Sequence, residues 1–267
     1  MRGNELVVRV PVTEPPFISR IVSVWYRHVR VYSRHLISNA LPPFLEPLIF
    51  LIGIGLGLGK YIDTMDGFPY LEYLASGLLM TAAMFTAAFE CTFGTYIRLE
   101  FDKVYDGMLA SPLTAGNLMV GEMLWAGTKG FVFTVSVLIV VTAFGTVPIG
   151  WSLVTPFIGF LTGVLFGALG LLITSFVKSI NHFNFFFTGL LSPMFFFSGV
   201  VFPVENLPAA IRPISEVLPL THPVRITRSL ALGQENPLWW FDLLYMVVFI
   251  VVVGWFAVRR LRKKLID

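Results

Sequence analysis

The sequence has little charge and almost no cysteine. Only 13% of its 267 residues are Asp, Glu, Lys or Arg, whereas soluble domains carry about a quarter. The single cysteine, Cys91, excludes an internal disulfide and a cysteine-based zinc site. The four histidines, which lack the spacing of metal ligands, are His28, His35, His182 and His222. Most of the chain is therefore expected to lie away from water, and no metal site is predicted.

Glycine-rich nucleotide-binding motifs are also missing. Residues 53–60 read GIGLGLGK, but a phosphate loop requires a glycine where Ile54 stands and a hydroxyl for magnesium where Tyr61 stands. The strict alternation of the glycines breaks the dinucleotide fingerprint as well. They form two overlapping small-xxx-small pairs, which are typical of close helix packing in membranes. These glycines are Gly53, Gly55, Gly57 and Gly59.

Catalytic motifs of hydrolases are absent too. The chain has no Gly-x-Ser-x-Gly elbow, no His-Glu-x-x-His pair and no paired aspartates like those of membrane enzymes that act on lipid phosphates. His222 follows Leu-Pro-Leu-Thr without a nucleophile, which is typical of a packed or interfacial histidine. We expect no catalytic residue, and a membrane enzyme is the weaker alternative.

Long apolar runs make up most of the chain, since 56% of its residues are hydrophobic. A helix needs about 20 residues to cross the hydrocarbon core of a bilayer. The runs that reach this length cover residues 38–60, 71–96, 118–145, 151–177, 183–203 and 238–258. We predict an all-α integral membrane protein with six transmembrane helices, in which a cytoplasmic N-terminal segment (1–37) precedes a transmembrane domain (38–267).

Six spans place both termini on one side of the membrane, and the basic residues indicate which side. Of the 19 lysines and arginines, 14 lie in the N-terminal segment, the 97–117 loop, the 178–182 turn and the C-terminal tail. The opposite loops hold four, which are Lys60, Arg212, Arg225 and Arg228. Because cytoplasmic loops carry an excess of positive charge, both termini are predicted to be cytoplasmic.

A basic amphipathic helix is predicted ahead of the first span, between Phe17 and Leu36. Its apolar face carries Ile18, Ile21, Trp25, Val29, Tyr32 and Leu36 at helical spacing. Its polar face carries Arg20, Ser23, Arg27, Arg30 and Arg34. Such a helix lies along anionic headgroups with its arginines toward the lipid, although an ordinary soluble helix has the same pattern.

Two loops have an unusual composition. The cytoplasmic loop 97–117 mixes charged and apolar residues and then stops at Ser111-Pro112, which predicts a short amphipathic helix that is either a connector or a docking element. The outer segment 199–237 carries six prolines among apolar residues. We expect it to form short helices that re-enter the membrane and pack on the spans, with a plain extracellular loop as the alternative.

Ionisable residues inside predicted spans require partners, because an unpaired charge there costs several kcal/mol. Glu46 lies between two prolines near the inner headgroups, and Glu90 lies about 12 Å above the cytoplasmic end of the second span. Lys129 shares a face of the third span with Glu122. We expect a Glu90–Lys129 or a Glu122–Lys129 pair inside the bundle.

Five stretches together resemble one family. They are EPLIFLIGIGLGLG (46–59), FECTFGTYIRLE (89–100), VGEMLWAGTKGF (120–131), SPMFFFSGVVFPVENLP (192–208) and LPLTHPVRITRSLALGQ (218–234). The chain resembles the membrane subunits of type-2 ATP-binding-cassette exporters, and within them the subgroup of nodulation-type lipo-oligosaccharide export permeases. The resemblance covers nearly the whole chain in order, and its central and C-terminal stretches are the most specific.

This resemblance implies a multi-pass permease of the bacterial inner membrane that forms a dimer on two copies of a separate ATPase. ATP and magnesium are then bound by the partner, and this chain binds no cofactor. The 97–117 loop becomes a coupling helix over 98–111 that docks on the ATPase. The docking residues implied are Arg98, Glu100, Phe101, Asp102, Lys103, Tyr105, Asp106 and Met108.

The implied function is ATP-driven export of an amphipathic substrate, such as a lipo-oligosaccharide, lipid-linked glycan, lipid or drug. The glycines of residues 53–59 then pack the first span on the other protomer or on a helix of the same one. A cluster of phenylalanines either rims the substrate path or faces lipid, and it comprises Phe185, Phe186, Phe187, Phe195, Phe196 and Phe197. The functional alternative is an ATP-independent secondary carrier or channel, since intramembrane carboxylates also occur in proton paths.

Overall fold

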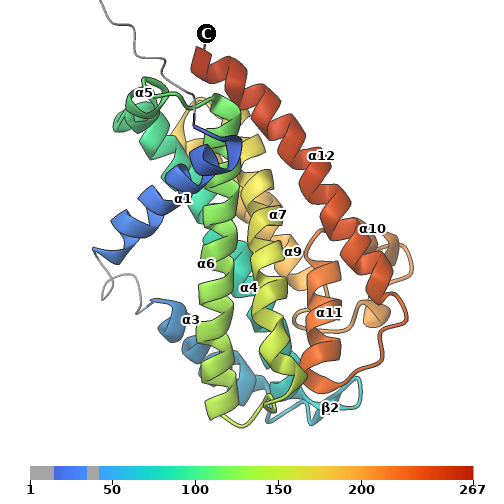
Figure 1. The fold of residues 1–267 in the computed structure, drawn as a ribbon. Coiled ribbons are helices and arrows are strands. Elements are labelled where there is room, and N and C mark those ends of the chain that lie inside the picture. The colour runs from blue at the N-terminus through green and yellow to red at the C-terminus, as the bar shows by residue number, and fades with distance from the viewer. Residues whose placement is uncertain (1–14, 35–41, 267) are drawn as a thin grey trace, which may run out of the picture.

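The computed structural model describes residues 15–34 and 42–266, and it is almost entirely helical. Most of the longer helices run along one common direction (Figure 1). The N-terminal half comprises α1 Phe17–Ser33, α3 Pro42–Phe50, η1 Leu51–Leu56, β1 Thr64–Met65, β2 Phe68–Pro69, α4 Tyr70–Phe89, η2 Glu90–Gly94, η3 Ile97–Phe101, α5 Val104–Leu109 and α6 Ala115–Ala143. The C-terminal half comprises η4 Trp151–Val154, α7 Thr155–Phe176, η5 Ile180–His182, α8 Phe183–Phe186, η6 Phe187–Leu191, α9 Ser192–Phe197, η7 Val204–Asn206, α10 Arg212–Val217, α11 Thr221–Leu232 and α12 Trp239–Ile266.

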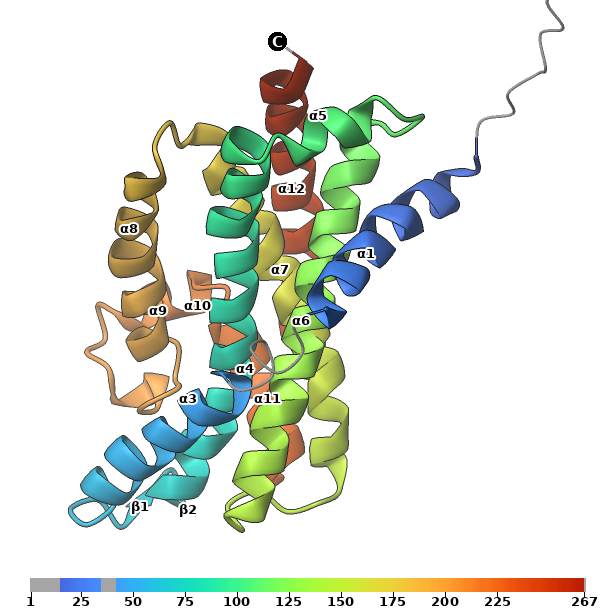
Figure 2. The same ribbon diagram turned by 90° about the vertical axis from the view of Figure 1, so that its left-hand side faces the viewer.

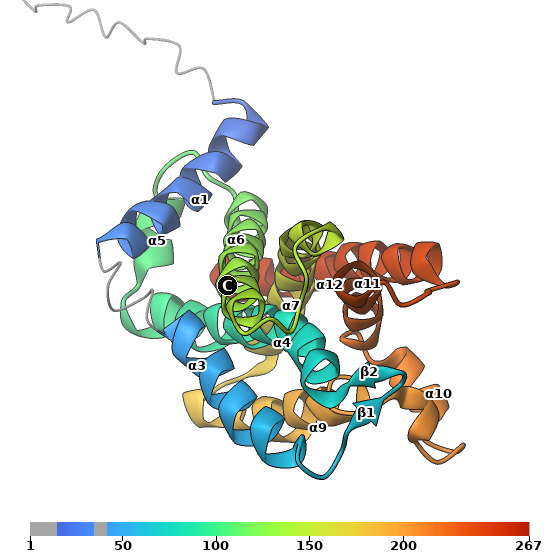
Figure 3. The ribbon, with the colours of Figure 1, turned by 90° about the horizontal axis from the view of Figure 1, so that it is seen from below.

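Helices α4, α6 and α7 form the centre of the bundle, and α12 packs on its outside (Figure 3). The α6–α7 contact depends on glycines that face each other. A Cβ atom added to Gly163 would lie 2.5 Å from the carbonyl oxygen of Ala126, and one added to Gly130 would lie 2.5 Å from the carbonyl oxygen of Gly159. The two backbones therefore touch directly, which is the close approach that small residues permit between membrane helices.

The described residues contain four helices that are long and apolar enough to cross a membrane. They are Tyr70–Phe101, Ala115–Ala143, Trp151–Phe176 and Trp239–Leu265. These helices correspond to the second, third, fourth and sixth predicted spans. The chain thus has the helical, multi-pass character that its composition predicts.

The first and fifth predicted spans correspond to shorter helices. Helix α3 continues through η1 to residue 58, and the preceding residues 35–41 lie outside the described part of the chain. The fifth predicted span is helical over 183–197 and ends at Ser198, because Gly199 has a φ of +81° that a right-handed helix cannot contain. The six-span count therefore stays a prediction.

The glycines of residues 53–59 divide into two kinds. A Cβ on Gly55 would clash with Leu71 of α4, so this glycine packs on a helix of the same chain. Gly53 and Gly57 have nothing within 4 Å of the position that a Cβ would take. Gly59 ends the helix, where its amide N–H donates to the carbonyl of Gly55 at 2.9 Å. One of the two predicted glycine surfaces is thus used within this chain.

Helix α1 runs obliquely across α6 (Figure 2). Its buried residues are Ile21, Val24 and His28, and the indole N–H of Trp25 donates to the Thr128 hydroxyl at 2.8 Å. The buried face of α1 therefore differs in part from the predicted apolar face. Ile18, which was predicted to lie on that face, is 73% exposed, whereas Val24 is fully buried. The helix occurs where it was predicted, but it uses this face to pack on protein.

The outer segment folds into short helices as predicted. Prolines begin or interrupt η7, α10 and α11, and the last of these packs on α4, α7 and α12. A two-stranded hairpin, in which Thr64 pairs with Pro69, lies at the same end of the bundle. In Figure 1 this end is at the bottom, whereas α5 and the C-terminus are at the top. Re-entry into a membrane is a prediction that the fold itself leaves open.

Candidate functional site

Six side chains form a buried polar cluster at the end of the bundle that carries α5. We refer to this cluster as the charge network. It comprises His28 from α1, Glu90 from η2, Arg98 from η3, Tyr105 from α5, and Glu122 and Lys129 from α6. Residues nearly a hundred positions apart in the sequence thus meet at one point, where α1, η2, η3, α5 and α6 each contribute a side chain.

Glu122 is the centre of the charge network. Its side chain is fully buried, and its carboxylate accepts hydrogen bonds from Arg98 Nη2 at 2.8 Å and from the Tyr105 hydroxyl at 2.8 Å. His28 Nε2 lies 2.9 Å from the same carboxylate and donates to it in the Nε2–H tautomer. A buried carboxylate is tolerated only with such partners, because desolvation of an unpaired charge is very costly.

Glu90 joins the second cation to the charge network. Lys129 Nζ lies 2.8 Å from its Oε2, and Arg98 Nη1 donates to its Oε1 at 2.7 Å. The Glu90–Lys129 pair expected from the sequence is therefore present, and Glu122 pairs with Arg98 in place of Lys129. Two carboxylates are thus paired with two basic side chains.

Three residues of the charge network also carry potential metal ligands. One ligand atom from each of His28, Glu90 and Glu122 lies within 4.8 Å of the others. However, all four carboxylate oxygens already accept hydrogen bonds from cationic or hydroxyl partners within the charge network. A metal ion would have to displace Arg98 or Lys129, so the geometry fits an ion-pair network better than a metal centre.

Helix α5 is joined to the bundle through Tyr105, which is 1% exposed. Burial, followed by the charge of Glu122, holds the pKa of this phenol well above its ordinary value. The hydroxyl therefore stays protonated and serves as a permanent donor to Glu122. Helix α5 is only six residues long, and Tyr105 is its buried residue.

The helix before α5 contains two π-helical turns, Glu90–Gly94 and Ile97–Phe101. Gly94 lies between the paired side chains, since a Cβ there would be 3.3 Å from Arg98 Nη1 and 3.4 Å from Glu90 Oε1. Such π-turns are frequent at functional sites. Here they bring Arg98 onto the face of Glu90.

The predicted coupling helix over 98–111 is two elements in the structure. The long helix continues to Phe101, and Lys103, with a φ of +50°, separates it from α5. Arg98 and Tyr105 face the bundle, where their polar atoms are bonded to Glu90 and Glu122, and their docking role stays a prediction.

The remaining predicted docking residues surround this break. Phe101 is 65% exposed, and Asp102, Lys103 and Asp106 are exposed with it. Glu100 binds Lys264 of α12 at 3.0 Å, and Met108 packs against the core. The exposed part of the predicted set is thus a small patch of mixed charge around one phenylalanine.

Other predicted residues lie elsewhere. The side chain of Glu46 is outside the described part of the structure. Among the clustered phenylalanines, Phe187 packs against Phe89 with ring centroids 4.3 Å apart, whereas Phe185 is 76% exposed. One phenylalanine of this cluster therefore packs η6 against the end of α4, and another is exposed on the surface.

Two histidine contacts, one in the charge network and one outside it, were not predicted from the sequence. His28 is a single histidine on a basic helix, and nothing in its spacing points to Glu122. His222 is buried as expected, but it also has a partner, since its Nδ1 lies 2.8 Å from Asp242 Oδ1 at the opposite end of the bundle. Its ring stacks on Tyr245 at 3.7 Å.

Comparison with known proteins identifies the fold. Residues 19–232 match the ABC-2 type transporter family. The chain belongs to this family. It is 33% identical to nodulation protein J of Rhizobium leguminosarum bv. viciae over 245 residues, which is 91% of this chain and 94% of that relative. It is 31% identical to nodulation protein J of Sinorhizobium fredii over 92% of this chain and 94% of the relative.

A more distant relative has a general transport name. Inner membrane transport permease YadH of Escherichia coli is 24% identical over 89% of this chain and 94% of its own length. The chain is therefore an ABC-2 permease, which is the membrane subunit of a transporter and not itself an enzyme. The charge network, α5 and three of the four long helices lie within the matched residues 19–232, and the last long helix, Trp239–Leu265, follows them.

Proposed function

We propose that this ABC-2 permease is the membrane subunit of an ATP-driven exporter that moves an amphipathic substrate out of the cytoplasm or inner leaflet. The observation that carries the proposal is the bond between α5 and the bundle through the charge network. Membership of the family implies an ATP-binding-cassette ATPase as partner. In this proposal the ATPase, with its ATP and magnesium, docks on α5.

The exposed patch around Phe101 supplies the docking surface. It presents one large apolar side chain, with Asp102, Lys103 and Asp106 around it. A buried aromatic anchor within a polar rim is the usual composition of an energetic centre in a protein interface. The patch adjoins Arg98 and Tyr105, so movement of a docked ATPase would act on the charge network directly.

The charge network can transmit that movement because it is rigid and shared. Tyr105 of α5 and His28 of α1 bind the same carboxylate, that of Glu122. Arg98 links this carboxylate to Glu90 and hence to the long helix. A displacement of α5 therefore shifts α1, α4 and α6 together, and this motion would open the bundle toward the outside.

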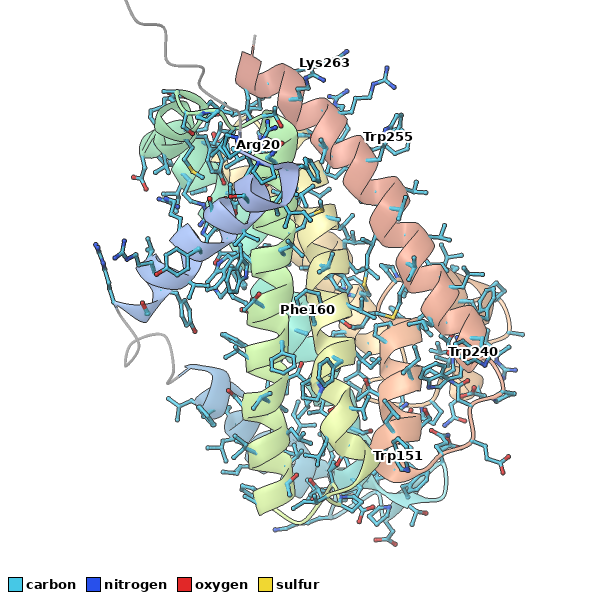
Figure 4. All side chains as sticks on the ribbon, in the orientation of Figure 1. Arg20, Trp151, Phe160, Trp240, Trp255 and Lys263 are labelled. Atoms are coloured by element: carbon cyan, nitrogen blue, oxygen red, sulfur yellow. The ribbon has the colours of Figure 1, made fainter. Side chains whose placement is uncertain are left out.

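The proposed topology has six spans, both termini in the cytoplasm and two copies of the chain on two ATPases. Basic side chains support this orientation, since Arg20 and Lys263 lie toward the α5 end (Figure 4). Trp151 and Trp240 lie toward the opposite end, where tryptophans are typical of a membrane interface. Both tryptophans are 77% exposed. Gly53 and Gly57 have open space beside them, and they provide a smooth surface for the second protomer.

The substrate class is proposed from the relatives. Those named nodulation protein J point to a lipo-oligosaccharide, and a lipid-linked glycan, lipid or drug has the same amphipathic character. The exposed Phe185 lies at the edge of the aromatic cluster, where an acyl chain could pack during its passage. The polar part of the substrate would pass between the helices.

Co-purification tests the proposal against an ATP-independent carrier. The complex is extracted from its native membrane, and its proteins and bound lipids are identified by mass spectrometry. We expect a soluble ATPase with a phosphate loop at a copy number equal to that of this chain. The ATPase should be lost from the complex in Asp102→Lys. It should be kept in the control variant Asp63→Lys, which alters an exposed aspartate before the hairpin. Transport by the purified chain alone, with no ATPase attached, would instead establish a carrier.

A further inference from the structure

A polar pocket lies at the end of the bundle opposite α5, outside the charge network. Its volume is about 220 Å³, and its walls are one face of α11, the 234–238 loop, the hairpin turn at Asp66, and residues 198–205. A cavity needs only about 10–15 Å³ of such volume to hold one water molecule. The pocket therefore has room for a small polar group in addition to water.

Two buried donors border the pocket and have unused hydrogen-bonding capacity. Ser198 is 1% exposed, and its hydroxyl has no partner among the described residues. Arg228 is 6% exposed, and its Nε and Nη2 bind Ser76 and the carbonyls of Tyr73 and Gly199. Its Nη1 makes no hydrogen bond within the described part of the chain, so it is the guanidinium nitrogen that remains available to donate. Both residues line the pocket, so they can donate to a ligand there.

The charges of the lining argue against an ionic ligand. Arg225 is already bound to Glu216 and Asp242, which leaves Arg228 as the cation that faces the carboxylates of Asp66, Glu205 and Glu235. An anion would meet this excess of negative charge. A divalent cation requires converging ligand atoms, and within the described residues the group that converges is the one in the charge network.

A neutral ligand rich in hydroxyls fits the lining. Hydroxyl groups both donate and accept, so they satisfy the donors of Arg228 and Ser198 together with the carboxylate and amide acceptors around them. Val204, Val224 and Leu238 add apolar surface, against which the C–H groups of a sugar ring can pack. The pocket is smaller than the ~300 Å³ of typical drug-sized sites, which suits one sugar unit.

We infer that this pocket binds one sugar unit of a neutral glycan. The inference rests on the proposed function, because it names the sugar part of the exported molecule as the ligand and places it at the outer end. The glycan would reach the pocket as the bundle opens, while its lipid part is still held among the helices.

The inference is tested by hydrogen–deuterium exchange of the backbone amides, measured on the complete complex in nanodiscs with no ATP added. The probes are cellotriose, chitotriose, inorganic phosphate and calcium chloride, each at millimolar concentration. We expect at least one of the two sugars to protect residues 198–205 and 221–238, and phosphate and calcium to leave them unchanged. Protection by phosphate or calcium alone, or by none of the probes, would overturn the inference.

Matched variants locate the binding. Ser198→Ala removes one unpartnered hydroxyl and should weaken sugar binding about fivefold, the effect of one hydrogen bond. Ser215→Ala removes another buried and unpartnered hydroxyl outside the pocket and should leave binding unchanged. Gln234→Trp fills the pocket entrance and should abolish binding. Equal affinity in all three variants would refute the assignment, whereas loss of the ATPase from the complex would refute only the proposed function.

Discussion

Replacing Tyr105 with phenylalanine removes the bond between α5 and the charge network while keeping the ring. The hydroxyl donates to a charged, fully buried acceptor, Glu122 Oε1, at 2.8 Å. Hydrogen bonds to charged groups contribute about 1.5–3 kcal/mol. Glu122 keeps Arg98 and His28, so the carboxylate does not become unpaired. We therefore expect a loss of about 2 kcal/mol in the attachment of α5, and no general unfolding.

The assay compares substrate export with ATP hydrolysis in proteoliposomes that contain the whole complex. About 2 kcal/mol corresponds to a shift of roughly 30-fold in the equilibrium between attached and detached α5. Export per ATP hydrolysed should therefore fall in Tyr105→Phe while hydrolysis continues. The control is Tyr96→Phe, whose hydroxyl donates to the carbonyl of Lys178 away from the charge network. An export-to-hydrolysis ratio equal to that of the unmodified protein would refute the reasoning.

A double-mutant cycle gives the energy of this bond directly. Unfolding is measured in nanodiscs for Tyr105→Phe, Glu122→Gln and the double variant. The two side chains are in contact, so their effects should not add, and an interaction energy of about 1–3 kcal/mol is expected. Additive effects would show that the bond contributes nothing.

Two further changes probe stability. Glu122→Ala leaves Arg98 buried beside an empty acceptor position and should destabilise the protein by about 3–5 kcal/mol. Glu122→Gln should destabilise it less. Equal melting temperatures of the two variants in nanodiscs would contradict this. Gly163→Ala places a Cβ 2.5 Å from the backbone of α6 and should lower the melting temperature. Gly53→Ala has open space beside the new Cβ and should not lower it. A lower melting temperature for Gly53→Ala than for Gly163→Ala would contradict the packing described.

Local patterns predicted much of the fold. The amphipathic spacing between Phe17 and Leu36 predicted α1, which occupies Phe17–Ser33. The proline pattern predicted the short helices after residue 199. Such predictions succeed because turn residues and hydrophobic periodicity act within a few neighbouring positions.

The charge network was only partly predictable. Opposite charges at similar depth predicted that Lys129 pairs with Glu90 or Glu122, and the structure has the pair with Glu90. Arg98, however, was assigned to the docking helix that the family resemblance implies, and in a regular α-helix it lies about 80° around the axis from Glu90. The π-helical turns change this phase and bring the two side chains together. No pattern in one sequence reports a π-turn, nor the long-range packing that brings His28 to Glu122.

Site-specific crosslinking tests the central claim that α5 and the adjoining Phe101 receive the ATPase. A photoreactive amino acid replaces Phe101, which is 65% exposed at the α5 end, and in a second variant it replaces Tyr61, which is 86% exposed near the hairpin. The complex is irradiated in native membranes, and the products are identified by mass spectrometry. Our account predicts that position 101 crosslinks to a phosphate-loop ATPase and that position 61 does not. Crosslinking of the ATPase at position 61 alone, or at neither position, would contradict it.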